Sequence, residues 1–219
     1  MVTGRRGEPL SRERIVEAAI GLLDSEGEGG LTFRALAKRL VTGPGAIYWH
    51  VKDKDELVGA ATDAVVAATM AVDVVGATPR EVVRALALGV FDAIEVHPWI
   101  GSQLARDPWR SPILRVFEQI GRQVQALGVA EAELFTAASA LLNHILGVGG
   151  QNVADRRGVR PDASRDEVLD AVAEAWASLD AEEYAFTRIV AGQLRDHDDR
   201  EEFLAGIDLI LAGITAGVP

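Results

Sequence analysis

Apolar residues recur every three to four positions along most of the chain, which is the spacing of one face of an α-helix. Near the N-terminus, Ile15, Ala18, Ala19, Leu22 and Leu23 fall on one such face. The alternation of polar and apolar residues that indicates β-strands is scarce. The pattern therefore predicts an all-α protein with about ten or eleven helices and no sheet.

Capping residues mark where these helices should begin, because a side-chain oxygen there can accept a hydrogen bond from an unpaired backbone N–H. Ser11 and Thr32 should cap the first two helices. Capping boxes are expected at Asp53/Glu56, Thr78/Glu81, Ser164/Glu167, Asp180/Glu183 and Asp199/Glu202. The longest continuous helical pattern runs from Glu131 to about Val153, and the polar residues 155–163 should form a loop.

The stretch from Leu31 to Lys54 contains two short helical patterns joined by a turn with glycine. It carries five basic residues, one acidic residue and His50. The second pattern opens with the small sequence Gly43-Pro44-Gly45-Ala46 and closes with Tyr48-Trp49-His50. A helix that enters a DNA groove needs a small leading turn and polar groups at its ends. The stretch predicts a helix-turn-helix, although aromatic packing in a small bundle would also explain the three aromatic residues.

Charge is distributed unevenly along the chain. The net charge is −11, yet residues 1–57 carry nine basic and nine acidic side chains, so residues 58–219 supply the whole excess. An acidic body beside a locally basic segment fits a protein that contacts phosphates with one end only. Residues 1–10, which include Arg5 and Arg6, are expected to form a flexible basic arm.

Composition excludes several other classes of protein. Cysteine is absent, which rules out disulfides and thiolate metal sites and suits a reducing compartment. No run approaches the roughly 18 apolar residues of a membrane span, and the N-terminus lacks the apolar segment of a secretory signal, so we expect a cytoplasmic protein. The four histidines lack metal-ligand spacing. We expect no metal site, no cofactor and no catalytic residue.

The sequence Leu31-Thr32-Phe33-Arg34-Ala35-Leu36-Ala37, followed by Gly45-Ala46-Ile47-Tyr48-Trp49-His50-Val51-Lys52-Asp53-Lys54-Asp55-Glu56-Leu57, resembles the N-terminal DNA-binding domain of the TetR family. The resemblance implies a homodimeric transcription regulator, usually a repressor that a small molecule releases from a near-palindromic operator. It places a three-helix DNA-binding domain in residues 11–57 and a helical ligand-binding and dimerisation domain in residues 58–219.

The motif, together with the position of each side chain in the two helices, indicates which residues contact DNA. These are Thr32, Arg34, Pro44, Gly45, Tyr48, Trp49, His50, Lys52 and Lys54. The chain departs from the family pattern at two places. Many members have Gly-Val-Ser in the turn where this chain has Val41-Thr42-Gly43. Ala46 replaces a Ser or Thr of some members, so one possible hydrogen bond to DNA is absent.

The resemblance also implies a ligand cavity among the fifth to eighth helices and a four-helix dimer interface. Candidate cavity residues are Phe91, Ile94, His97, Trp99, Trp109, Phe117, Asn143, His144 and Gln151. Candidate interface residues are Leu141, Leu142, Ile145, Phe203, Ile207, Ile210, Leu211 and Ile214. The same apolar stripe would also serve as an ordinary core face within one subunit.

Other functions remain open from the sequence. The chain could be an activator, or a helical ligand-binding protein or enzyme that retains an unused helix-turn-helix. Tetracycline is not the expected ligand, because residues 64–71 lack the histidine that tetracycline binders carry near the end of the fourth helix.

Overall fold

The computed structural model describes residues 9–70, 76–106, 111–158 and 164–216, which form eleven α-helices and two 3₁₀ helices and contain no strand. The bounds are α1 (Arg12–Gly30), α2 (Phe33–Arg39), α3 (Pro44–Tyr48), α4 (Lys54–Met70), α5 (Pro79–Val96), α6 (Trp99–Arg106), α7 (Ser111–Ala126), η1 (Glu131–Glu133), α8 (Leu134–Gly158), α9 (Arg165–Ala177), α10 (Ala185–Val190), η2 (Ala191–Asp196) and α11 (Asp199–Thr215). The all-α prediction is confirmed. Of the predicted basic arm, residues 1–8 lie outside the described residues.

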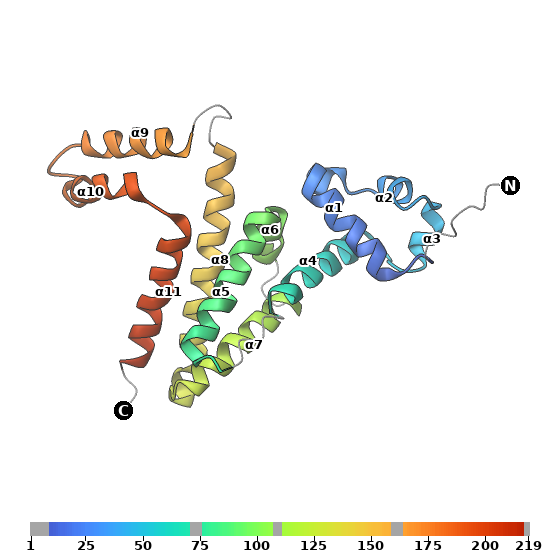
Figure 1. Cartoon of the computed structure of the whole chain (residues 1–219), viewed down its shortest axis with the longest axis horizontal. Coiled ribbons are helices and arrows are strands. Elements are labelled where there is room, and N and C mark those ends of the chain that lie inside the picture. The colour runs from blue at the N-terminus through green and yellow to red at the C-terminus, as the bar shows by residue number, and fades with distance from the viewer. Residues whose placement is uncertain (1–8, 71–75, 107–110, 159–163, 217–219) are drawn as a thin grey trace.

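The helices form three groups (Figure 1). Helices α1 to α3 form a head at one end of the molecule, and α5 to α8 with α11 form a body. Helix α4 connects them, since it packs against α1 of the head and against α5 and α7 of the body. Helices α9, α10 and η2 pack against one another and form a C-terminal projection (Figure 1). None of the described helices has the length and apolar character needed to cross a membrane.

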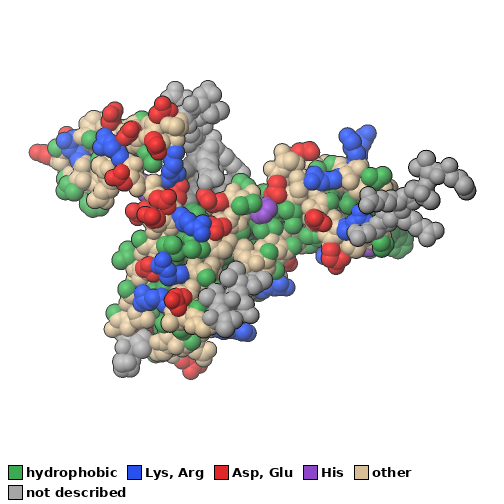
Figure 2. Space-filling view, in the orientation of Figure 1, with side chains coloured by type: hydrophobic (Ala, Val, Ile, Leu, Met, Phe, Trp, Pro, Cys, Tyr) green, Lys and Arg blue, Asp and Glu red, His purple; other side chains and the backbone are tan. Residues whose placement is uncertain are grey.

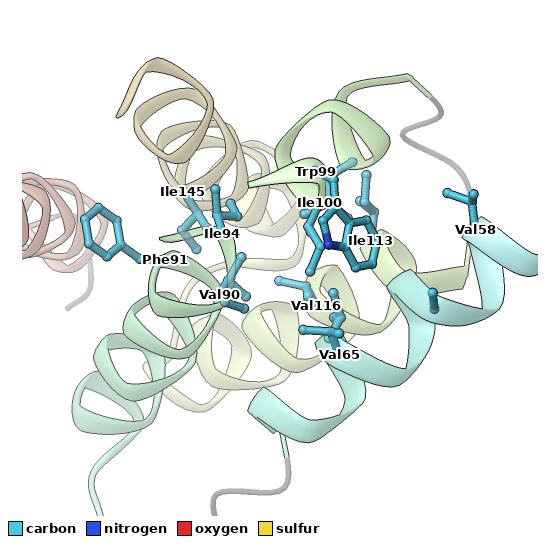
Figure 3. Packing of buried hydrophobic residues seen from close by; sticks show 14 of the residues in the cluster. Val58, Val65, Val90, Phe91, Ile94, Trp99, Ile100, Ile113, Val116 and Ile145 are labelled. Carbon is cyan, nitrogen blue, oxygen red and sulfur yellow. The ribbon is translucent and has the colours of Figure 1, made fainter. Parts of the chain in front are cut away.

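A continuous apolar core runs from the head through α4 into the body. In the head, Ile15, Leu36 and Ile47 are completely buried and join α1, α2 and α3. Figure 3 shows how the body continues this core, with side chains from α4 to α8 meeting between the helices. The labelled residues there are Val58, Val65, Val90, Phe91, Ile94, Trp99, Ile100, Ile113, Val116 and Ile145. The head is therefore a rigid platform rather than a loosely attached segment.

Most helix starts follow the capping residues. The side chains of Ser11, Thr32, Thr78 and Ser164 each accept a hydrogen bond from a backbone N–H in the first turn of their helix. Thr78 and Ser164 in turn each donate their backbone N–H to a glutamate carboxylate, which completes the predicted capping box. These predictions are confirmed because capping depends on residues only three positions apart.

The box predicted at Asp53 and Glu56 forms only in part. Asp53 Oδ1 accepts a hydrogen bond from the Glu56 N–H at 2.8 Å, as expected. The Glu56 carboxylate, however, accepts from the N–H of Lys52, also at 2.8 Å, instead of from that of Asp53. The Glu56 carboxylate also forms an ion pair with Arg12 on α1, which keeps the carboxylate directed toward α1.

Of the two boxes predicted near the C-terminus, the one at Asp199/Glu202 is wrong and the one at Asp180/Glu183 forms only in part. Asp198, not Asp199, caps α11, because Asp198 has the extended cap backbone and accepts from the N–H groups of Arg200 and Glu201, whereas Asp199 is already the first helical residue and pairs with Arg165 at 2.7 Å. Asp180 does accept from the N–H of Glu183, but only a turn follows, and α10 begins at Ala185.

The loop predicted for residues 155–163 is also wrong in part. Helix α8 continues to Gly158, so residues 155–158 are helical, and residues 159–163 lie outside the described part of the chain. Arginine is a good helix former, and no Gly or Pro interrupts the pattern between residues 151 and 157. A polar sequence alone was therefore a poor reason to end the helix.

Candidate nucleic-acid interface

The buried side of the helix-turn-helix is formed by a few apolar anchors. Ile47 on α3 is completely buried, and Val51, just after α3, is 1% exposed. Leu36 anchors α2 in the same way. With these three residues turned into the head, the opposite faces of α2 and α3 point to solvent.

The exposed side of α3 ends in two aromatic residues. The Tyr48 ring stacks on Phe33 with ring centroids 4.3 Å apart, yet 55% of Tyr48 remains exposed. Trp49 is 87% exposed. A tryptophan is highly buried in most proteins, so an exposed one next to the exposed Tyr48 makes this end of α3 a candidate binding surface. Packing within the head accounts in part for Tyr48 and leaves Trp49 unexplained.

The turn between α2 and α3 keeps the geometry that normally relies on glycine. The Thr42 N–H donates to the Ala37 carbonyl at 2.9 Å, and the Val41 N–H donates to the Lys38 carbonyl at 3.4 Å. These two bonds form a Schellman motif, which places the residue after the helix cap in the left-handed region. Here that residue is Val41, with φ of 52°. The turn is thus intact although the family glycine is absent, and the valine carries the strain.

The leading turn of α3 presents little more than backbone. Pro44 occupies the first turn and is exposed, as are Gly43 and Gly45. A Cβ atom added at either glycine would meet nothing within 4 Å. These glycines are therefore not required by packing inside the protein. They leave open space through which a DNA backbone or base edge can approach closely.

The basic residues of the stretch divide into exposed and engaged side chains. Arg34 and Lys38 on α2 and Lys52 after α3 are exposed. Lys54 is half-buried, and its ammonium group donates to the backbone carbonyl of Glu28 at the end of α1. In this conformation Lys54 therefore fixes α4 to α1 and does not point to solvent as an exposed lysine would.

Arg12 was not expected in the site, yet it joins three elements. Its Nη1 donates to the carbonyl of His50 at 2.8 Å and pairs with Glu56 of α4 at the same distance. The Lys52 N–H and the Arg12 guanidinium together hold the pKa of Glu56 below its ordinary value. Arg12 thereby fixes the end of α3 relative to α1 and α4. A sequence pattern could not show this, because the contact spans 38 residues.

The nine candidate cavity residues do not converge on one place. Phe91 and His144 both stack on Phe203, with ring centroids at 4.7 Å and 5.5 Å. His97 and Trp99 instead face Asp24 of the head.

The remaining candidates lie apart from both groups. Ile94 is in the core, Asn143 and Gln151 are exposed, and Phe117 lines an open groove of about 760 Å³ between α4 and α7. Trp109 lies outside the described residues. The composition of a ligand cavity stays a prediction.

The predicted dimer interface needs correction. Five of its eight residues are buried within one subunit and cannot meet a partner; they are Leu141, Ile145, Phe203, Ile207 and Leu211. Leu142, Ile210 and Ile214 are half-buried. The stripe is thus mainly a core face of the subunit, which is the alternative that the sequence left open.

Two family profiles match the chain. The profile for bacterial regulatory proteins of the tetR family matches residues 15–61. The profile for the tetracyclin repressor-like C-terminal domain matches residues 76–218. The first match covers the head and the start of α4, and the second covers the body and the projection.

Individual relatives agree with these profiles. The chain is 59% identical to a TetR transcriptional regulator from Streptomyces coelicolor, with a TM-score of 0.87 over 96% of this chain and 100% of that one. It is 30% identical to an HTH-type transcriptional regulator from Saccharopolyspora erythraea over 63% of this chain, and the match spans 59% of that relative. ActR from Streptomyces coelicolor, solved in complex with actinorhodin, shares the fold at 23% identity, with a TM-score of 0.76 over 96% of this chain and 99% of that one.

Proposed function

Because the chain belongs to the TetR family of bacterial transcriptional regulators, we propose that it is a homodimeric repressor that a small molecule releases from operator DNA. One observation carries the proposal, namely the 87% exposed Trp49 at the end of a firmly anchored α3. In this arrangement α3 enters the major groove.

The contacts to DNA follow from the exposed side chains. The open backbone at Pro44 and Gly45 and the indole of Trp49 reach base edges or the sugar next to them. Arg34, Tyr48 and Lys52 contact phosphates, and Thr32 adds a hydroxyl at the start of α2. His50 and Lys54 join the phosphate contacts after small rearrangements, since Lys54 now bonds to Glu28. Figure 2 shows acidic and basic side chains interspersed over the head, the body and the C-terminal projection, so no single-sign patch covers the face seen there.

The second subunit packs on the exposed side of α8 and α11. The two helices run antiparallel (Figure 1) and cross where the His144 ring lies over Gly206. Exposed residues beside this crossing are Ala140, Asn143 and Gly147 on α8, and Ala205, Leu209 and Ala212 on α11. Helical periodicity puts both sets on the same side of the pair. Small residues let two helix pairs approach closely, and Leu209, 75% exposed, supplies apolar surface.

Dimerisation explains how a five-residue recognition helix can be selective. Two copies of α3 about 34–36 Å apart would meet successive major grooves of a near-palindromic site. A ligand in the body changes this separation through α4, because α4 packs against both head and body. Crystals with and without ligand should therefore differ in head separation, and equal separations would contradict this step.

The DNA contacts can be tested by fluorescence anisotropy with the region upstream of the protein's own gene. Trp49→Ala should weaken binding strongly. Phe186→Ala is the matched control, because Phe186 is also a highly exposed aromatic residue but lies on the projection. Wild-type affinity should fall steeply with salt, since phosphate contacts release counterions. No binding, or flat salt dependence, would favour a ligand-binding protein with an unused helix-turn-helix.

The dimer surface is tested separately by sedimentation at several concentrations. Leu209→Glu should give monomers, because a carboxylate at the centre of the interface would be desolvated without a partner. Val96→Glu changes an apolar residue of similar exposure, 68%, at the end of α5 and should leave the dimer intact. A dimeric Leu209→Glu variant would place the interface elsewhere.

A further inference from the structure

A polar contact joins the head to the body at some distance from the DNA surface. The Oδ1 atom of Asp24 on α1 accepts a hydrogen bond from the indole Nε1 of Trp99 at 2.7 Å. The same oxygen lies 2.7 Å from Nδ1 of His97. Trp99 is 5% exposed and packs in the core beside Ile100 and Ile113 (Figure 3). Its indole N–H therefore has a fixed direction, and it holds one point of the head.

A second contact lies four residues further along the chain, beyond a kink in α1. The Glu28 carboxylate accepts hydrogen bonds from Gln103 Nε2 at 2.6 Å and from Ser102 Oγ at 3.3 Å. Gly27, with φ of 67° and ψ of −172°, turns the backbone just before Glu28. This conformation is essentially restricted to glycine. The kink thus determines how Glu28 meets α6.

Together the two contacts fix an orientation. Asp24 precedes the Gly27 kink and Glu28 follows it, and their donors come from α6 and the corner before it. Hydrogen bonds to charged groups are directional and stronger than neutral ones. Two such attachment points, one on each side of the kink, resist rotation of α1 against α6 more than a single bond would. We call these residues the α1–α6 clasp.

We propose that Trp99 and Gln103 are positioning residues for operator binding, which they influence by holding the head, through Asp24 and Glu28, at one angle to the body. The inference rests on the proposed dimeric repressor. In a dimer joined through the body, the angle of each head sets the separation of the two α3 helices. The clasp thereby determines which half-site spacing the dimer accepts.

The separation can be measured without DNA. The chain has no cysteine, so Lys38→Cys on the exposed face of α2 gives one spin-label site per subunit. Pulsed electron–electron distance measurements on the dimer should show a narrow distribution in the otherwise unchanged protein. Adding Trp99→Phe and Gln103→Ala should broaden it, because Phe keeps the ring in the core but lacks the N–H. Trp176→Phe on α9 is the matched control and should change nothing.

The effect on DNA is measured with operators whose half-sites are moved apart or together by one base pair. In the Trp99→Phe/Gln103→Ala protein, the ratio of affinities for native and altered spacing should fall about tenfold. This is the size expected for lost hydrogen bonds to charged groups. The slope of log affinity against log salt should stay unchanged, because no phosphate contact is removed. A general loss of stability would lower affinity for all spacings equally.

The outcomes separate the two proposals. If the variant keeps both the narrow distance distribution and the wild-type spacing preference, the positioning role is wrong. If the wild-type protein binds no operator, the repressor proposal fails, and the distance distributions alone decide whether the clasp orients the heads.

Discussion

Val41 offers the most direct test of how the helix-turn-helix is built. It occupies the position after the cap of α2 with φ of 52°, in a Schellman motif whose two hydrogen bonds come from Val41 and Thr42. A residue with a Cβ atom in the left-handed region costs about 1–2 kcal/mol relative to glycine. A β-branched residue lies at the upper end of that range. We therefore expect Val41→Gly to stabilise the head.

The expected gain can be worked out from the structure. Val41 is 92% exposed, so its removal sacrifices almost no buried surface. Glycine loses more backbone entropy on folding, which offsets about 0.4–1 kcal/mol of the relieved strain. With about 2 kcal/mol of strain relieved, the net stabilisation should be about 1–1.6 kcal/mol. The two backbone hydrogen bonds of the turn remain possible, so the position of α3 should not change.

Hydrogen exchange of the backbone amides is the suitable assay, because it reports the local opening of α2 and α3. The amide of Thr42, which donates to Ala37, should exchange more slowly in Val41→Gly than in the wild type. Val41→Ala is the control: it keeps the Cβ atom and with it most of the strain. If Val41→Gly protects Thr42 no better than Val41→Ala does, the left-handed strain is not what limits this turn.

Three further changes test other parts of the argument. Gly27→Ala should cost about 1–3 kcal/mol in unfolding free energy through backbone strain alone, since a Cβ there meets nothing within 4 Å. Gly29→Ala, where a Cβ would also meet nothing and φ is not positive, should be nearly neutral. Urea titration of both variants measures the two unfolding free energies. Asp198→Ala should cost about 1 kcal/mol by removing the cap of α11, and Asp198→Asn, which retains an acceptor oxygen, should cost little. Arg165 lowers the pKa of Asp199, so this pair stabilises the folded protein above about pH 4, and the stabilisation is lost as the pH falls further. Arg165→Gln should therefore reduce the fall in unfolding free energy below that pH. An unchanged pH dependence would contradict this role.

Features whose partners lie close together in the sequence could be predicted, and features whose partners lie far apart could not. Ser11 and Thr32 were found because a cap and its partner lie three residues apart. The sequence showed that Val41 stands where many family members have glycine. It could not show that the turn would keep its shape with valine there. The clasp between Asp24 and Trp99 joins residues 75 positions apart and has no local signal.

The residues predicted for the dimer interface differ from the surface proposed above for another reason. An apolar stripe on a helix indicates burial but not what buries it. Ile207 and Leu211 satisfy the pattern of an interface, yet the core of their own subunit already covers them. The better signal for a partner is Leu209 on the same helix, because its 75% exposure leaves apolar surface uncovered.

Two tryptophans show why residue type alone cannot distinguish a residue that positions the head from one that contacts DNA. Trp99 and Trp49 are chemically identical, but the first is 5% exposed with its N–H bonded to Asp24, and the second is 87% exposed. Burial gives Trp99 a single direction, which suits a residue that orients the head. Exposure gives Trp49 free surface, which suits a residue that meets DNA. Trp49→Phe and Trp99→Phe should therefore differ in kind: the first should lower affinity at every half-site spacing, and the second should change which spacing is preferred. If both variants changed affinity in the same way at all spacings, the division between a reading residue and a positioning residue would not hold.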